Sequence, residues 1–202
     1  MDIKKKLFIG IEAIIYFSFI FLDLYGRNSI YLKYLGIIIC FVYALINKKF
    51  YISIALFFTV IADYFLLVID SHYILGVISF IFVQIVYFLY LKKNNCDLFI
   101  KIRILIIIII VLVSLLFKID ILYCLTLCYF SVLVINCISS YTNKNLRIFS
   151  IGLTLFILCD ISVGLFNILP SGTLYTIVSF LMWIFYLPSQ VLISLSKDTS
   201  KL

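Results

Sequence analysis

The chain of 202 residues is 66% hydrophobic and only 12% charged, with a mean hydropathy of +1.28. Soluble domains are about 45–50% apolar and about 25% charged, so this composition excludes a soluble enzyme and a disordered chain. The net charge of +7 would indicate nucleic acid in a soluble protein, but in a membrane protein it more often reports orientation. We therefore predict a multi-pass protein of the cell membrane that contacts membrane lipids and binds no nucleic acid.

Eight apolar stretches follow one another along the chain, separated by short polar clusters. A membrane-spanning helix needs about 20 mostly apolar residues, and a lone segment in lipid must satisfy its own backbone, which favours helix. The predicted spans are Leu7–Tyr25, Tyr31–Ile46, Phe50–Ile69, Tyr73–Leu91, Ile102–Phe117, Ile121–Ile138, Ile148–Ile168 and Thr173–Ser194. They predict an all-α polytopic membrane protein in which residues 1–202 form a single transmembrane domain.

The basic residues alternate between the connections. Counting the N-terminal segment as the first connection, all Lys and Arg residues except Arg27, Lys33 and Lys118 fall in the odd-numbered ones. Because Lys and Arg accumulate on the cytoplasmic side of membrane proteins, both termini are predicted to be cytoplasmic. The basic residues of the fifth connection, Lys92, Lys93, Lys101 and Arg103, could also hold phospholipid headgroups.

The third and seventh spans carry a similar pattern. Ala55 to Asp63 and Gly152 to Asp160 each place one Asp after eight small or mostly apolar residues. A four-helix repeat preserves direction, so the chain is predicted to contain two parallel four-helix repeats, residues 1–97 and 98–202.

Three acidic residues, Glu12, Asp63 and Asp160, lie deep within spans, where an ionisable group costs roughly 2.5–3.5 kcal/mol and by default marks function. The helical rise places Asp63 about 20 Å and Asp160 about 18 Å from the cytoplasmic ends of their spans. Two carboxylates in a low-dielectric site cannot both ionise cheaply, so the pair supplies an acid and a base. The alternatives are a structural bridge between helices or an ion pair with Lys33, and for Glu12 an ion pair with Lys4–Lys6.

Other residue types narrow the chemistry. His72 is the single histidine and the six cysteines lack paired spacing, so no metal site and no cofactor are expected. Asn167 lies seven residues after Asp160, on the same helical face. Pro188 removes a backbone hydrogen bond to Ile184 within the last span.

Five motifs occur in order across these spans. They are Leu32-Lys33-Tyr34-Leu35, Ala62-Asp63-Tyr64-Phe65-Leu66-Leu67, Gly76 to Tyr87 with Phe80 and Gln84, Gly152 to Asp160 with Asn167, and Tyr186 to Ile193 with Gln190. Together they resemble the YhhN-like lysoplasmalogenase family of small eight-span membrane proteins. The chain departs from the family pattern at Tyr34 (Pro in the family), Ala62 (Gly), Gln84 (His) and Cys159 (Ser).

The resemblance implies hydrolysis of the vinyl-ether bond of a lysophospholipid-type substrate, a lysoplasmalogen, to a fatty aldehyde and a glycerophospho-alcohol, without a cofactor. Asp63 and Asp160 are then the catalytic residues. The implied substrate-binding residues are Lys33, which could hold the phosphate, together with Gln84, Tyr87, Asn167, Gln190 and Glu12. Two other functions stay open: a small lipid- or solute-binding protein or proton-coupled transporter, and a structural membrane subunit.

Overall fold

The computed structural model describes residues 3–96 and 99–197, and within these residues it contains helices and no strand. The main helices are α1 (Ile3–Leu24), α2 (Ile30–Ile46), α3 (Phe50–Asp63), α4 (Tyr73–Lys93), α5 (Ile100–Leu116), α6 (Ile121–Ser140), α7 (Arg147–Ile168) and α8 (Thr173–Leu195). A π-helical segment, η1 (Tyr64–Val68), continues α3, and a short 3-10 helix, η2 (Lys144–Leu146), leads into α7. One of these helices overlies each predicted span, so the all-α prediction is confirmed.

Six helical segments are long and apolar enough to cross a membrane: Ile3–Leu24, Phe50–Val68, Tyr73–Lys93, Ile121–Ser140, Lys144–Ile168 and Thr173–Leu195. The remaining two, α2 and α5, have 17 residues each, at the lower edge of the range of roughly 17–25 that spans a bilayer. The protein is thus a multi-pass membrane protein, while the count of eight spans stays a prediction.

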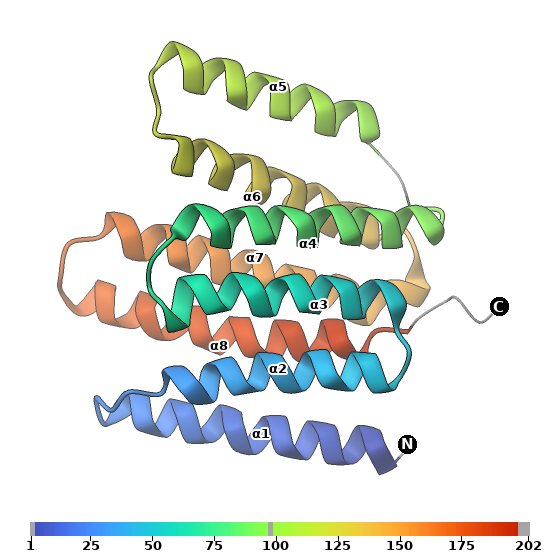
Figure 1. Cartoon of the computed structure of the whole chain (residues 1–202), viewed down its shortest axis with the longest axis vertical. Coiled ribbons are helices and arrows are strands. Elements are labelled where there is room, and N and C mark those ends of the chain that lie inside the picture. Colours follow the sequence, from blue (N-terminus) through green and yellow to red (C-terminus); the bar gives the residue numbers. More distant parts are fainter. Residues whose placement is uncertain (1–2, 97–98, 198–202) are drawn as a thin grey trace.

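Successive main helices run in opposite directions, so the bundle has two ends (Figure 1). At one end α1, α3, α5 and α7 begin and the basic clusters of the odd-numbered connections gather, and we call it the basic end. At the far end α2, α4, α6 and α8 begin. The described basic residues at the far end are Arg27, Lys33 and Lys118. This arrangement separates the charges as the sequence pattern required.

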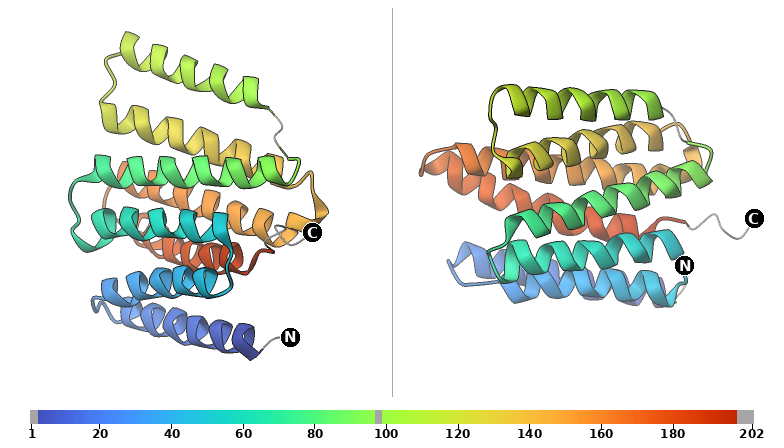
Figure 2. Two further views of the ribbon diagram at one scale, coloured as in Figure 1. Left: turned by 45° about the vertical axis from the view of Figure 1, so that its right-hand side comes forward. Right: turned by 45° about the horizontal axis from the view of Figure 1, so that its top comes forward.

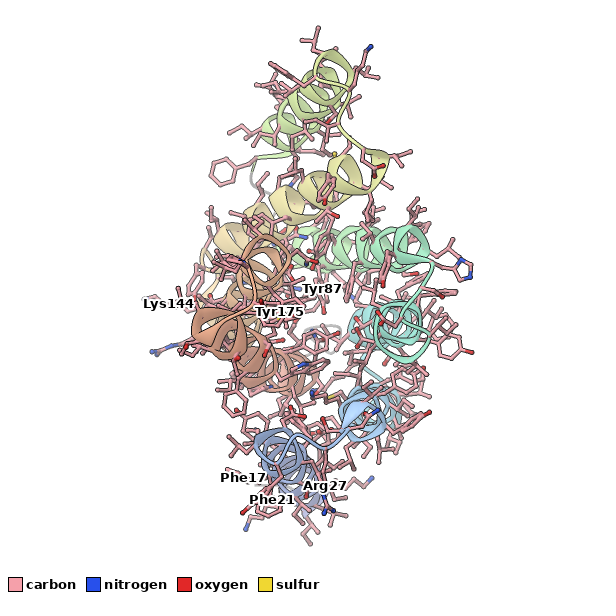
Figure 3. All side chains as sticks on the ribbon, turned by 90° about the vertical axis from the view of Figure 1, so that its left-hand side faces the viewer. Phe17, Phe21, Arg27, Tyr87, Lys144 and Tyr175 are labelled. Atoms are coloured by element: carbon pink, nitrogen blue, oxygen red, sulfur yellow. The ribbon has the colours of Figure 1, made fainter. Side chains whose placement is uncertain are left out.

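Six helices form a closed ring. Each packs against the next in the order α2, α3, α4, α6, α7, α8, and α8 packs again on α2. Figure 3 views the bundle nearly along its helices and shows the ring, with Tyr87 labelled in its interior. The two other helices lie outside, α1 against α2 and α8, and α5 against α6. Figure 2 shows α5 at one edge of the molecule in both views.

The order of neighbours is the same in the two halves of the chain. The contacts of α1 with α2, α2 with α3 and α3 with α4 correspond to those of α5 with α6, α6 with α7 and α7 with α8. The contacts that join the halves, α4 with α6 and α8 with α2, correspond as well. Two parallel repeats would produce this order, and the repeat itself remains a prediction.

Two glycines allow helices of the ring to approach closely. A Cβ at Gly152 on α7 would lie 2.8 Å from Ile193 Cγ1 and 3.1 Å from the backbone oxygen of Ser189 on α8. A Cβ at Gly76 on α4 would lie 2.5 Å from Leu66 Cγ in η1. Small residues at such contacts permit the tight packing that holds membrane helices together without a hydrophobic driving force.

The effect of Pro188 is visible in α8. Proline has no backbone N–H, so the carbonyl of Ile184 loses its helical partner. The hydroxyl of Tyr16 on α1 donates a hydrogen bond to this oxygen at 3.4 Å. The lost backbone contact is therefore partly replaced by a contact between α1 and α8.

Candidate active site

Asp63 is the last residue of α3 and points into the ring, where it is only 5% exposed. The hydroxyl of Tyr186 on α8 lies 2.8 Å from Asp63 Oδ1 and 2.6 Å from Oδ2. A buried carboxyl group requires such a donor, because leaving it without one costs the full desolvation penalty. Tyr186 is itself 5% exposed, so this contact crosses the interior of the ring from α8 to α3.

The backbone after Asp63 is unusual. The helix widens into the π-helical segment η1, a rare geometry that is frequently found at functional sites. Leu66 in this segment packs over Gly76 of α4, which fixes the end of the third span against the fourth. The position of the Asp63 carboxyl is thereby set by its own helix and by the contact with α4.

Asp160 on α7 has a matching partner. The hydroxyl of Tyr129 on α6 donates to Asp160 Oδ2 at 2.5 Å, and Tyr129 is 6% exposed. Asp160 itself is partly buried. Its Oδ1 accepts no hydrogen bond from the described residues, so one oxygen of this carboxyl remains available to a ligand.

The two Asp–Tyr pairs belong to one site. Asp160 lies close enough to Asp63 to act on it electrostatically, and Cys159 is close to both carboxyl groups. Phe80 lies between the pairs, with its ring centroid 5.5 Å from that of Tyr129 and 5.7 Å from that of Phe156. Phe156 in turn lies 5.8 Å from Tyr186. This row of aromatic rings joins the two tyrosines and gives the site the apolar setting that a low-dielectric acid pair requires.

Lys33 lies at the far end, where it forms an ion pair with Asp23 at 2.8 Å. Asp23 also accepts a short hydrogen bond from Ser29. The Lys33 ammonium lies 4.4 Å from the ring centroid of Trp183, and that ring lies 5.7 Å from Tyr186. The alternative in which Lys33 neutralises a deep Asp is therefore wrong, since its partner is Asp23, but one aromatic ring links Lys33 to the site.

Glu12 on α1 is buried, with an exposed fraction of 3%. Cys40 Sγ on α2 donates to Glu12 Oε1 at 3.4 Å, and Glu12 Oε2 has no hydrogen-bond partner. The alternative of an ion pair between Glu12 and Lys4–Lys6 is thus wrong. Glu12 reaches from the outer helix α1 towards α2, where a Cβ at Gly36 would lie 3.3 Å from Oε2.

Three of the predicted binding residues are fully buried in the half of the ring nearer the basic end. Gln84 accepts hydrogen bonds from Asn136 Nδ2 at its backbone and side-chain oxygens, both at 3.0 Å. The hydroxyl of Tyr87 has no partner, and this side chain lies close to Cys40. Gln190 donates to Ser189 Oγ at 3.3 Å and its Oε1 has no partner.

Asn167 does not join this site. Its side chain is exposed near the far end of α7, and its Nδ2 donates to the backbone oxygen of Val163 at 2.8 Å. Seven residues correspond to about 10.5 Å along a helix, so Asn167 shares a face with Asp160 but lies two turns beyond it.

The two tyrosines that bond the carboxyl groups, Tyr129 and Tyr186, were not among the predicted site residues, although Tyr186 begins the last of the five motifs. Tyr186 precedes Gln190 by four residues and so shares its helical face, a signal that was available in the sequence. Nothing marks Tyr129 among the 15 tyrosines of the chain. Among the described residues no group of three or more His, Cys, Asp or Glu side chains is placed to hold a metal ion.

These features define a class: a multi-pass α-helical membrane protein with two tyrosine-bonded carboxyl groups, one buried and one partly buried, inside a ring of helices. The model of the YhhN family matches residues 28–197. The chain therefore belongs to the YhhN family, as the order of its motifs had indicated, and the matched region contains α2 to α8 with both Asp–Tyr pairs. Comparisons with curated proteins and with solved structures give no match.

Proposed function

We propose that this protein hydrolyses the vinyl-ether bond of lysoplasmalogens and releases a fatty aldehyde and a glycerophospho-alcohol. The observation that carries the proposal is the placement of Asp63 and Asp160 together inside the ring, each hydrogen-bonded by a tyrosine hydroxyl. Membership of the YhhN family is compatible with this activity. The reaction needs one proton donor and one proton acceptor within a water-poor site, and this pair of carboxyl groups can supply both.

The first step is proton transfer to carbon. The protonated carboxyl group of the pair delivers its proton to the β-carbon of the vinyl ether, and the former double bond becomes an oxocarbenium ion. The ionised carboxylate stabilises this cation electrostatically, as the second carboxylate does in glycosidases. Asp160 Oδ1 is the oxygen that we assign to substrate contact, because it is free of hydrogen bonds with the described residues.

The second step adds water. The carboxylate that was ionised from the start removes a proton from water as the water oxygen attacks the cationic carbon, which gives a hemiacetal. Collapse of the hemiacetal breaks the bond to the glycerol oxygen, which takes a proton from the carboxyl group protonated during water attack. The carboxylate that donated its proton to the β-carbon in the first step accepts the proton of the hemiacetal hydroxyl. Both groups then regain their starting protonation states, so one water is consumed and no cofactor takes part.

Tyr186 and Tyr129 hold the two carboxyl groups in position for these transfers. Each phenol donates a hydrogen bond, which stabilises the ionised form that its Asp adopts at one stage of the cycle. Rigid orientation of acid and base contributes to the rate because the reacting atoms meet without reorganisation.

The other binding residues have proposed roles that follow from their placement. Gln84, Tyr87, Gln190 and Glu12 carry buried polar atoms without partners, which suits them to hold the hydrolytic water or substrate oxygens on the basic-end side of the pair. Lys33 would attract the substrate phosphate from the far end through its ion-paired ammonium, and Asn167 would meet the headgroup at the surface.

A surface hollow supports access from the far end. It is lined by His72, Tyr73, Ile74, Leu75, Asp120 and Leu122, at the first turns of α4 and α6. Leu122 precedes Tyr129 by seven residues, so the hollow lies about 10.5 Å from the tyrosine of the second Asp–Tyr pair, on the same face of α6. The proposed path of the lysolipid runs between these two helices.

For the topology, we propose that all eight helices cross the cell membrane with both termini in the cytoplasm. The gathering of Lys and Arg at the basic end supports this orientation. The equivalent order of helix neighbours supports two parallel four-helix repeats within the single domain.

The test is a product assay with purified protein. A lysoplasmalogen is incubated with the protein, and the aldehyde and the glycerophospho-alcohol are measured by mass spectrometry. The control substrate is the lysophospholipid with the same chain attached by a saturated ether, which cannot form the oxocarbenium ion by protonation. We expect aldehyde from the vinyl ether alone. Proton-coupled flux in proteoliposomes without aldehyde would instead identify a transporter and overturn the proposal.

A further inference from the structure

Arg103 on α5 is the most deeply buried arginine among the described residues, with an exposed fraction of 5%. It lies near the basic end, three residues after α5 begins. The one ion pair between described residues joins Lys33 and Asp23, so no described carboxylate neutralises Arg103. A buried charge without a counter-ion costs several kcal/mol.

Neutral groups from two helices hold the guanidinium. Nη1 donates to Asn136 Oδ1 at 2.5 Å and Nη2 donates to Ser139 Oγ at 3.3 Å, both on α6. The ring of Phe88 on α4 lies 4.7 Å from the guanidinium carbon. These contacts fix the position of the cation between α4, α5 and α6, but they bring no negative charge to it.

Two hydrogen-bond donors in this network remain without acceptors. Arg103 Nε has no partner, and neither has Nε2 of Gln84, whose oxygen is joined to Arg103 through Asn136. Gln84 is 1% exposed. Native proteins satisfy nearly all buried donors, so two orphaned donors beside an unneutralised cation indicate a ligand rich in acceptors and negative charge.

We propose that Arg103, with Gln84 and Asn136 behind it, forms a binding site for the phosphate group of an anionic phospholipid. The guanidinium fork matches the oxygens of a phosphate, and Arg is the preferred residue for this contact. Arg103 lies about 4.5 Å from the end of its helix, which is the depth of lipid headgroups. One exposed cation, Lys92, lies one turn beyond Phe88, and basic sites between helices at this level favour anionic lipids.

The site is separate from the acid pair. On α6 Asn136 lies seven residues beyond Tyr129, two turns nearer the basic end. Gln84 is shared with the proposed substrate-binding residues but Arg103 is not, so the assignment of Arg103 does not rest on the proposed hydrolase activity. Its consequence is structural: the bound lipid would join the outer helix α5 to α4 and α6, where α5 has few other contacts within the described residues.

The test compares the thermal unfolding of purified protein in detergent with added lipids. Phosphatidylglycerol is expected to raise the Tm of the wild type, because a ligand that binds only the folded state stabilises it. Phosphatidylcholine with the same chains is expected to give less than half of that shift. Inorganic phosphate at matched ionic strength tests whether free phosphate stabilises the protein as well as a phospholipid headgroup does. A shift from inorganic phosphate as large as that from the lipid, or equal shifts from the two lipids, would overturn the assignment.

The decisive variant is Asn136→Asp. It places a carboxylate on Arg103 Nη1, so the protein carries its own counter-ion, while Gln84 loses the donor that Asn136 Nδ2 offered to its two oxygens. This variant is expected to lose most of the Tm response to phosphatidylglycerol, and a response equal to that of the wild type would overturn the assignment. Lys101→Gln, which removes an exposed cation, is the matched control and is expected to keep most of the response.

Arg103→Gln provides a second variant if Asn136→Asp does not fold. Native mass spectrometry is expected to show one retained phosphatidylglycerol on the wild type and on Lys101→Gln, and none on Arg103→Gln. Retention of the lipid by Arg103→Gln, or its equal loss from Lys101→Gln, would show a diffuse surface attraction and overturn the site.

Discussion

The hydroxyl of Tyr186 lies 2.8 and 2.6 Å from the two carboxyl oxygens of Asp63, although 123 residues separate them in the chain. The contact joins α8 to α3 across the interior of the ring. Asp160 and Tyr129 form the corresponding pair between α7 and α6. The site therefore depends on contacts that exist only when the ring is closed.

Tyr186→Phe is expected to lower kcat for aldehyde release by about 10- to 100-fold, because Asp63 loses the donor that orients its carboxyl group. The ring contacts with Trp183 and Phe156 remain, so the free energy of unfolding should fall by about 1–3 kcal/mol, the cost of leaving the buried carboxyl group without its donor. Tyr129→Phe should act in the same direction through Asp160. Steady-state kinetics with the purified variants measure the effect.

Tyr175→Phe is the control for these tyrosine variants. Its ring stacks on Phe166 with centroids 4.3 Å apart, and its hydroxyl donates no hydrogen bond to the described residues. We expect wild-type kcat for this variant. If all three variants lost activity equally, the positioning role of Tyr186 and Tyr129 would be refuted.

The ion pair between Lys33 and Asp23 gives a stability prediction. Lys33→Met leaves the Asp23 carboxylate, whose side chain is only 20% exposed, without its cation, and should reduce the free energy of unfolding by about 2 kcal/mol. The double variant with Asp23→Asn removes both charges and should be more stable than the sum of the single changes implies. Thermal unfolding of the four proteins in one detergent measures this, and additive costs would mean that the pair contributes nothing.

Gly152→Val tests the close contact between α7 and α8. The added side chain would meet Ile193 and the α8 backbone at Ser189, which cannot move aside as a flexible side chain can. We expect a loss of about 2 kcal/mol or more. Gly164→Val on the same helix has nothing within 4 Å of its added Cβ and should change stability by less than about 0.5 kcal/mol. Similar losses in both variants would argue against this contact.

The positions of the helices could be predicted from the sequence because a bilayer dictates both their length and their apolar character. The depth of Asp63 and Asp160 followed from the helical rise alone. The closure of the ring between α8 and α2 could not be predicted, since a residue facing lipid and a residue facing the core are equally apolar in such a protein. For the same reason, the inward-facing tyrosines could not be selected from the others.

The contacts of three charged residues could not be predicted from the sequence. Arg103 was interpreted as an orientation signal or as a residue that could hold a phospholipid headgroup, and the sequence did not show that its side chain turns inward to Asn136. Lys33 is paired with Asp23, ten residues earlier, because the turn between α1 and α2 brings the two helix ends together. Glu12 pairs with Cys40 because its helical face is covered by α2, which the sequence of α1 does not reveal.

The acid pair is tested most directly by the isotopic composition of the aldehyde formed in D2O. A lysoplasmalogen is added to the purified wild type, to Asp63→Asn and to Asp160→Asn. The aldehyde is trapped as its hydrazone, and the mass of the hydrazone is measured by mass spectrometry. Protonation of the β-carbon predicts one deuterium on the carbon next to the carbonyl in the wild-type product, and no aldehyde from either folded variant. An aldehyde without that deuterium, or wild-type turnover by either variant, would contradict the account.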